Sequence, residues 1–222
     1  MIRRDYLLRQ IEDFIAAMAK LAGLAKNEQW QEASALAGSQ FRALAGADAA
    51  ELLRLSDTEL LANIIQGEPT HVVENKIFML ATLFKANGDL LASQGQREES
   101  QPYYLKGLHL LLDTFAQNEL SKRYDFVPTI EAFLIGLHDS TLPLKTNALL
   151  MRHYEQICDF ARAEDALFAM LESDPANVEL LDFGIAFYRR LLPLSDEVLA
   201  AGNLPREEVK AGLAELNKRR HL

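Results

Sequence analysis

The stretch YEQICDFARAEDALFAMLESDP, from Tyr154 to Pro175, contains the only cysteine of the chain. Apolar residues recur every three or four positions on both sides of Cys158, which is the period of a helix. Ala163 is a small residue near the start of the second half, and Pro175 closes the stretch. Because two helices cross closely only where side chains are small, the pattern predicts a helix, a turn at Cys158 and a second helix that packs on the first at Ala163.

Two other segments share the outline of this turn. NEQWQEAS (27–34), GQREESQP (95–102) and CDFARAED (158–165) each contain a helix end, a turn and then a small residue, which is Ala33, Ser100 or Ala163. These small residues are 67 and 63 positions apart. Each separation is close to twice ~34 residues, the length of a tetratricopeptide repeat, which indicates an internal helical repeat.

The regions around the second and third turns resemble the tetratricopeptide-repeat family. Around the third turn, Leu150 and Tyr154 correspond to the pair of large residues in the first helix of the family's motif, and Phe160 corresponds to its turn aromatic. Ala163 corresponds to the small residue at the helix crossing, Leu167 to the large residue of the second helix, and Pro175 to the closing proline. Around the second turn, Gly88 and Gly107 stand at the expected helix crossings. The match covers about 80–115 and 144–175 and is poor elsewhere. The resemblance implies helix pairs that stack to bury a continuous core.

The predicted fold is therefore all-α. We expect antiparallel helix pairs stacked as an irregular, tetratricopeptide-like right-handed solenoid of about nine to eleven helices. The sequence predicts a single domain over residues 1–222, in which 1–46 form an N-terminal helix pair, 47–75 an irregular helical connection, 76–175 the best repeat region and 176–222 the capping helices.

Local signals place the helix ends. Gly46 ends a second helix, and Ser56 followed by Glu59 is a capping box that begins a short one. Pro128 lies within an apolar pattern and must either begin a helix or kink one.

A second resemblance covers nearly the whole chain. The segments IRRDYLLRQIEDF, LLASQGQREES and FGIAFYRRLLPLSDEVLAAGNLPREEV are similar to an uncharacterised family of bacterial proteins. That family has no established activity, so the resemblance implies one shared architecture without a function.

Composition narrows the classes of partner. The formal net charge is -9, which opposes binding to nucleic acid. One cysteine excludes an intramolecular disulfide, and a reducing bacterial cytoplasm is the expected location. Charged residues interrupt every apolar run, so neither a signal peptide nor a membrane span is predicted.

No motif for catalysis or for a cofactor is present in the sequence. Cys158 and His153 are five positions apart on one helix and would point in different directions, so a thiol–imidazole pair is not expected. The histidines form no metal-binding pattern, and glycine-rich phosphate loops are missing. We therefore expect a protein that is not an enzyme and that has neither cofactor nor metal.

The expected function is binding of a protein or peptide partner along the inner helix faces. In the register of the repeat, the candidate partner-binding residues are Lys85, Asp89, Lys145, Arg152, Glu155 and Arg189. Asp89 would repel a ligand carboxylate, so a clamp for a chain terminus is disfavoured at Lys85. Two alternatives stay open, a small-molecule sensor or enzyme with an enclosed pocket and a structural homo-oligomer such as a homodimer.

Overall fold

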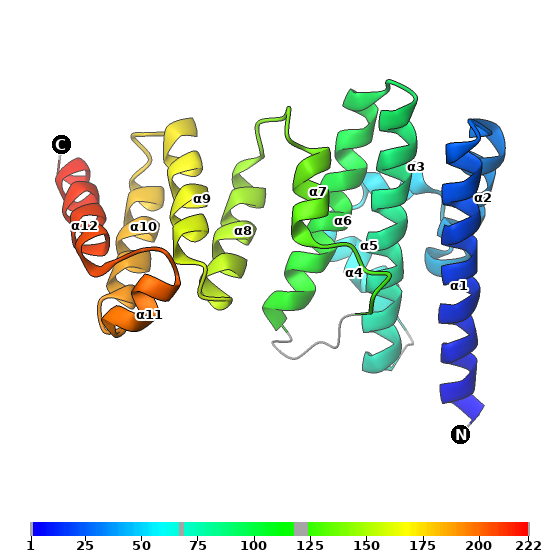
Figure 1. Ribbon diagram of the computed structural model, residues 1–222, viewed down its shortest axis with the longest axis horizontal. Helices are drawn as coiled ribbons and strands as arrows, with labels where there is room; N and C mark the ends of the chain where they lie inside the picture. The colour runs from blue at the N-terminus through cyan, green and yellow to red at the C-terminus, as the bar shows by residue number, and fades with distance from the viewer. Residues whose placement is uncertain (1, 67–68, 118–123, 222) are drawn as a thin grey trace. The chain divides into compact units, whose positions relative to one another are not determined.

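The computed structural model describes residues 2–66, 69–117 and 124–221, and every regular element in these ranges is a helix. The all-α prediction is thereby confirmed. The chain divides into two compact units, Met1–Ser140 and Thr141–Leu222 (Figure 1).

The N-terminal unit contains seven of the described helices. A long antiparallel pair, α5 and α6, forms its centre, and α1 and α2 pack on α5 while α7 packs on α6. The bounds are α1 Ile2–Lys26, α2 Trp30–Ala45, α3 Ala49–Arg54, α4 Asp57–Ile65, α5 Thr70–Ser93, α6 Arg97–Gln117 and α7 Ile130–Gly136. Phe41, Phe78, Phe84 and Phe133 are fully buried in this unit.

The α5–α6 pair is close because glycine stands at its contacts, as the sequence predicts. A Cβ atom at Gly88 of α5 would lie 2.7 Å from the ring of Tyr104 on α6. At Gly107 of α6 it would lie 2.6 Å from the ring of Phe133 and 3.0 Å from the carbonyl oxygen of Ala81. Since carbon atoms do not approach so closely, a larger residue at either position would push the helices apart.

The C-terminal unit contains five of the described helices, in which α8 and α9 form a hairpin and α10 packs against α9 and α12 (Figure 1). Their bounds are α8 Leu144–Gln156, α9 Phe160–Ser173, α10 Val178–Leu191, α11 Asp196–Ala201 and α12 Arg206–Arg220. At Gly184 of α10, an added Cβ would meet Leu216 of α12 at 2.5 Å and Leu167 of α9 at 3.0 Å. The absence of a side chain at this glycine therefore allows α9 and α12 to pack closely against α10 at the same point.

The three turns aligned in the sequence have the same backbone conformation. Glu28, Gly95 and Cys158 have φ angles of 57°, 80° and 58°, which lie in the left-handed region. The amide of the residue after each one donates to the carbonyl five residues earlier: Gln29 to Leu24, Gln96 to Leu91 and Asp159 to Tyr154. This is the hydrogen bond of the Schellman motif, which satisfies the last carbonyls of the first helix.

The small residues that follow these turns are buried as predicted. Ala33, Ser100 and Ala163 are exposed by 0%, 1% and 0%. Each donates its amide to the carbonyl four positions earlier, so each lies in the first turn of its helix. The equivalence of the three segments therefore extends from the turn to the first packed residue beyond it.

Other predicted helix ends are also present. Ser56 accepts from the Glu59 amide while Glu59 accepts from the Ser56 amide, which confirms the capping box of α4. Pro128 precedes α7, whose N-cap is Thr129. The described ranges hold twelve helices, above the expected nine to eleven, because a six-residue helix forms at α3, where the sequence has no long apolar period.

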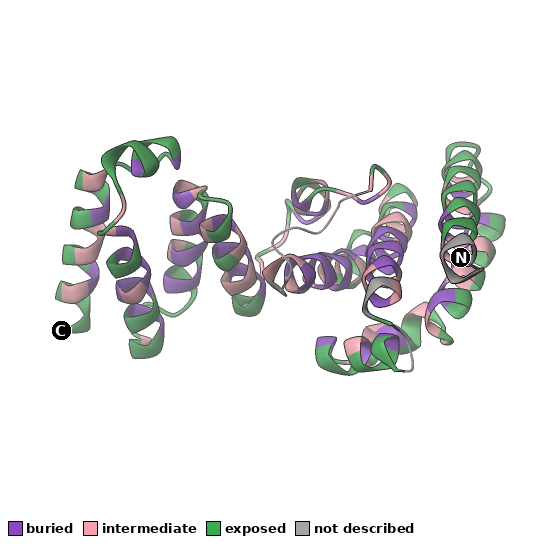
Figure 2. Cartoon of the chain, turned by 90° about the horizontal axis from the view of Figure 1, so that it is seen from below, coloured by how far each residue is buried: buried purple, intermediate pink, exposed green. Residues whose placement is uncertain are grey.

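The exposed faces of the helices carry the polar residues. Figure 2 shows buried and exposed residues alternating around the helices of each unit, with the buried ones on the sides that face neighbouring helices. Among the described residues, no helix is sufficiently long and apolar to cross a bilayer.

Candidate functional site

A cleft lies between α8 and α10 in the C-terminal unit. Its volume is about 500 Å³, and its walls are mostly apolar and partly open to solvent. The residues that line it are Lys145, Ala148, Leu149, Arg152, Glu155, Phe183 and Arg190. The volume falls within the ~300–1,000 Å³ that is usual for binding sites.

The helical period explains why these residues share a cleft. Ala148, Leu149 and Arg152 lie three, four and seven positions after Lys145 on α8, so the four residues occupy one face. The opposite face of α8 carries Leu150 and Tyr154 into the contact with α9. On α10, Phe183 and Arg190 are seven residues apart and again share a face.

An ion pair joins the two helices at one end of the cleft. The Nε and Nη2 atoms of Arg190 donate to the two carboxylate oxygens of Glu155 at 2.6 and 2.8 Å. Hydrogen bonding to this carboxylate raises the pKa of the Arg190 guanidinium above its ordinary value. Since Glu155 and Arg190 lie in the last turns of α8 and α10, these helices run in the same direction.

The remaining cations of the cleft come from α8. Arg152 is exposed and makes no ion pair or hydrogen bond with any other residue that the structure describes. Lys145 is the second residue of α8, so the positive end of the helix dipole lies beside Lys145 in the cleft. The lining thus contains three cations and one carboxylate.

Three of the six predicted partner-binding residues meet in this cleft: Lys145, Arg152 and Glu155. On α10 the arginine that lines the cleft is Arg190, the immediate neighbour of the predicted Arg189, which is exposed. One position corresponds to about 100° around a helix, so the two arginines point to different sides. Ala148, Leu149, Phe183 and Arg190 were not predicted to line a binding site. For Phe183 and Arg190, the seven-residue spacing on α10 is the sequence signal that places both on one helix face.

The other two predicted residues lie in the N-terminal unit. Lys85 and Asp89 pair with each other along α5, with distances of 2.9 and 2.7 Å from Nζ to the carboxylate oxygens. The hydroxyl of Tyr104 also donates to Asp89, at 2.9 Å. Burial, followed by the charge and the hydrogen bond of Asp89, raises the pKa of Tyr104. These contacts stabilise the α5–α6 pair and satisfy the charge of Lys85 locally.

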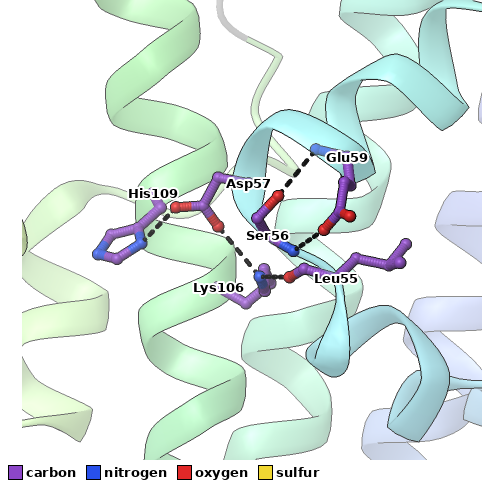
Figure 3. Close-up of polar contacts among 6 residues, drawn as sticks. All are labelled: Leu55, Ser56, Asp57, Glu59, Lys106 and His109. Carbon is purple, nitrogen blue, oxygen red and sulfur yellow. Dashed lines mark hydrogen bonds and ion pairs between the residues drawn. The ribbon is translucent and has the colours of Figure 1, made fainter.

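A buried charge cluster in the same unit was not predicted. The carboxylate of Asp57 at the start of α4 accepts from Nζ of Lys106 and contacts Nδ1 of His109, both at 3.0 Å (Figure 3). Lys106 also donates to the carbonyl of Leu55 at 2.6 Å. Asp57 and Lys106 are only 8% and 9% exposed. Because the partners satisfy one another, the cluster fastens the α3–α4 connection to α6.

A half-buried carboxylate in the C-terminal unit is hydrogen bonded to a tyrosine. The hydroxyl of Tyr188 on α10 donates to Glu164 on α9 at 2.6 Å. Burial raises the pKa of Glu164 and the nearby carboxylates Glu208, Asp165 and Glu215 raise it further, whereas the Tyr188 hydroxyl lowers it. Burial, together with the hydrogen bond to Glu164, raises the pKa of Tyr188 in turn. The pair lies within packed helices and outside the cleft lining.

Cys158 is exposed at the α8–α9 turn, in the position that the sequence predicts for it. Within the described ranges, no group of three or more histidine, cysteine, aspartate or glutamate side chains is arranged to hold a metal ion. The α8–α10 cleft is therefore the candidate functional site.

Comparison with known proteins identifies the family. The sequence pattern described as "Family of unknown function (DUF6483)" matches residues 1–221, so the chain belongs to that family. No curated protein and no solved structure matches the chain.

Proposed function

We propose that this member of a family of unknown function is a non-catalytic interaction module, which binds an extended segment of a protein partner in the cleft between α8 and α10. The observation that carries the proposal is the cleft itself, with apolar walls and charged residues at defined positions. Such a combination is typical of recognition sites, in which apolar surface supplies affinity and a few polar groups supply orientation.

The finer proposal is that the helix pairs form a tetratricopeptide-like array. The three matching turns and the buried small residues beyond them support it. In such an array α8 and α10 would be the first helices of consecutive repeats. Their parallel direction, with α9 between them in the chain, agrees with this assignment.

The openness of the cleft favours a peptide over a small molecule. A small ligand is usually enclosed over ~70–90% of its surface, whereas an extended peptide needs a site from which its two ends can leave. The cleft is partly open, and Phe183 in its wall is 38% exposed. The large exposed aromatic ring offers apolar surface that a bound side chain would cover.

An array of immobilised ten-residue peptides of random sequence tests the proposal. We expect the purified full-length chain to be retained by a subset of the peptides, and the Phe183→Glu variant to lose these signals because a carboxylate would replace the apolar wall. Val198→Glu is the matched control, since Val198 is 39% exposed on α11 and does not line the cleft.

Two results would contradict the proposal. One is retention of the wild-type chain by no peptide on the array. The other is equal retention of Phe183→Glu and the wild type, which would place binding elsewhere. Circular dichroism of both variants shows whether each still folds.

A further inference from the structure

We propose that the segment bound in the α8–α10 cleft is acidic, with two carboxylates placed on either side of an apolar side chain. This inference rests on the proposed function, because it concerns the occupant of the same cleft.

The charge of the cleft is opposite to that of the chain. The whole sequence carries a formal net charge of -9, whereas Lys145, Arg152 and Arg190 outnumber the single carboxylate of Glu155 in the lining. A local positive region on an acidic protein attracts acidic segments. Charge complementarity therefore selects an acidic partner.

The two arginines of the cleft differ in their contacts. Arg190 already binds the carboxylate of Glu155 through two hydrogen bonds. Arg152, in contrast, has no ion pair within the described ranges, and its guanidinium can accept a carboxylate in the bidentate geometry that arginine prefers. A carboxylate of the partner should therefore bind Arg152 first.

The spacing of the cations sets the spacing of the acids. Lys145 and Arg152 are seven residues apart on α8, which is about 10 Å along the helix axis. An extended chain advances about 3.3 Å per residue. Carboxylates two to four positions apart in the partner therefore reach both cations, given the length of the lysine and arginine side chains.

The apolar wall excludes a simple polyanion as the preferred occupant. Ala148 and Leu149 lie on α8 between the two cations, and Phe183 faces the cleft from α10. A nucleic acid backbone would neutralise the cations but leave this surface unfilled. A leucine, isoleucine or phenylalanine between the two acids would cover it, which adds affinity that charge alone does not supply.

The array described above reports the composition of the retained peptides. We expect enrichment in aspartate or glutamate at positions two to four apart, with an apolar residue between them. One retained peptide, labelled with fluorescein, is then titrated with the full-length chain and followed by fluorescence anisotropy. Arg152→Gln is expected to weaken binding at least about tenfold, because the bidentate, charge-assisted contact with the carboxylate is lost.

Arg189→Gln is the matched control for this titration. It removes the same charge from an exposed arginine of the same unit, but Arg189 does not line the cleft. We expect its affinity to stay within about twofold of the wild type, because exposed charges outside a contact are screened by salt. A peptide whose two acids are replaced by glutamine is expected to bind at least about tenfold more weakly than the original.

The outcomes separate this inference from the proposed function. Peptides retained through Phe183 but lacking acidic residues would overturn the inference and leave the function standing. Equal losses in Arg152→Gln and Arg189→Gln would also overturn it, since the effect would be one of net charge. If an acidic peptide without an apolar residue bound as tightly as the original peptide, the apolar wall would not contribute to binding, and that part of the inference would be overturned. Absence of any retained peptide would overturn both.

Discussion

Glu155 on α8 and Arg190 on α10 form a bidentate ion pair, with N–O distances of 2.6 and 2.8 Å, that bridges the cleft at one end. The side chain of Glu155 is 22% exposed and that of Arg190 is 49% exposed, so water screens the pair. The pair therefore contributes little to stability. Its larger effect is on the cleft, because a carboxylate of the protein itself binds the guanidinium of Arg190 there.

Glu155→Gln is accordingly expected to increase the affinity for acidic peptides. The substitution removes a carboxylate from the cleft and releases Arg190 for the partner, so an increase of about tenfold is expected. The free energy of unfolding is expected to fall by no more than about 1 kcal/mol. Anisotropy titration and urea denaturation measure the two quantities.

Glu172→Gln controls for net charge in this comparison, since Glu172 is exposed on α9 and does not line the cleft. An unchanged affinity in Glu155→Gln, or the same increase in Glu172→Gln, would show that Glu155 does not compete with the ligand.

Ala163→Leu is expected to destabilise the C-terminal unit. Ala163 is fully buried in the first turn of α9, and three additional carbon atoms have no space there. Overpacking of this kind costs about 1–3 kcal/mol or more. Ala169→Leu is the control, because Ala169 is exposed on the same helix. Urea unfolding that gives equal stabilities for the two variants would disprove close packing at Ala163.

Cys158→Gly is expected to stabilise the protein. Cys158 has a φ angle of 58°, and a residue with a Cβ atom is strained in that region whereas glycine is not. Glycine relieves this strain but loses more conformational entropy on folding. The free energy of unfolding is therefore expected to rise by about 0.5–1 kcal/mol.

Cys158→Ser serves as the comparison, since serine keeps the Cβ atom and its stability should stay within about 0.5 kcal/mol of the wild type. Thermal or urea unfolding distinguishes the three proteins. A loss of stability in Cys158→Gly would mean that the thiol makes a contact that outweighs the backbone strain.

Glu164→Gln is expected to stabilise the protein near neutral pH. The folded state holds the pKa of Glu164 above its ordinary value of 4.5, chiefly because the carboxyl is partly buried. The folded protein thus binds its proton more tightly than the unfolded chain, and stability contributed by this group falls as pH rises through the folded pKa. Glutamine keeps an oxygen that accepts from Tyr188 but has no charge to bury.

The pH dependence provides the test. The gain in melting temperature of Glu164→Gln over the wild type is expected at pH 7 and should diminish below the ordinary pKa of 4.5, where both side chains are neutral. A difference between the two proteins that is constant from pH 4 to pH 8 would refute the assignment.

The helix ends were predictable because they depend on local chemistry. Gly46 and Gly95 adopt left-handed backbone at helix ends, and Ser56 with Glu59 forms the expected capping box. Gly88 and Gly107 stand at close contacts because only small residues fit there. The six-residue helix α3 was not predicted, since so short a segment has no apolar period to detect.

The site was predictable only in part. The face of α8 that carries Lys145, Arg152 and Glu155 follows from the helical period. The opposite wall required the rotation of α10, which is fixed by the contact of Gly184 with Leu167 and Leu216. The Asp57–Lys106 pair joins residues 49 positions apart, and no local pattern predicts such a contact.

The location of binding is tested most directly by nuclear magnetic resonance. The ¹⁵N-labelled full-length chain is titrated with an unlabelled peptide retained on the array, and amide shifts are mapped onto the sequence. We expect the largest changes in α8 from Lys145 to Glu155 and in α10 from Phe183 to Arg190. Changes concentrated in α5 and α6, with α8 and α10 unaffected, would contradict the assignment of the cleft as the binding site.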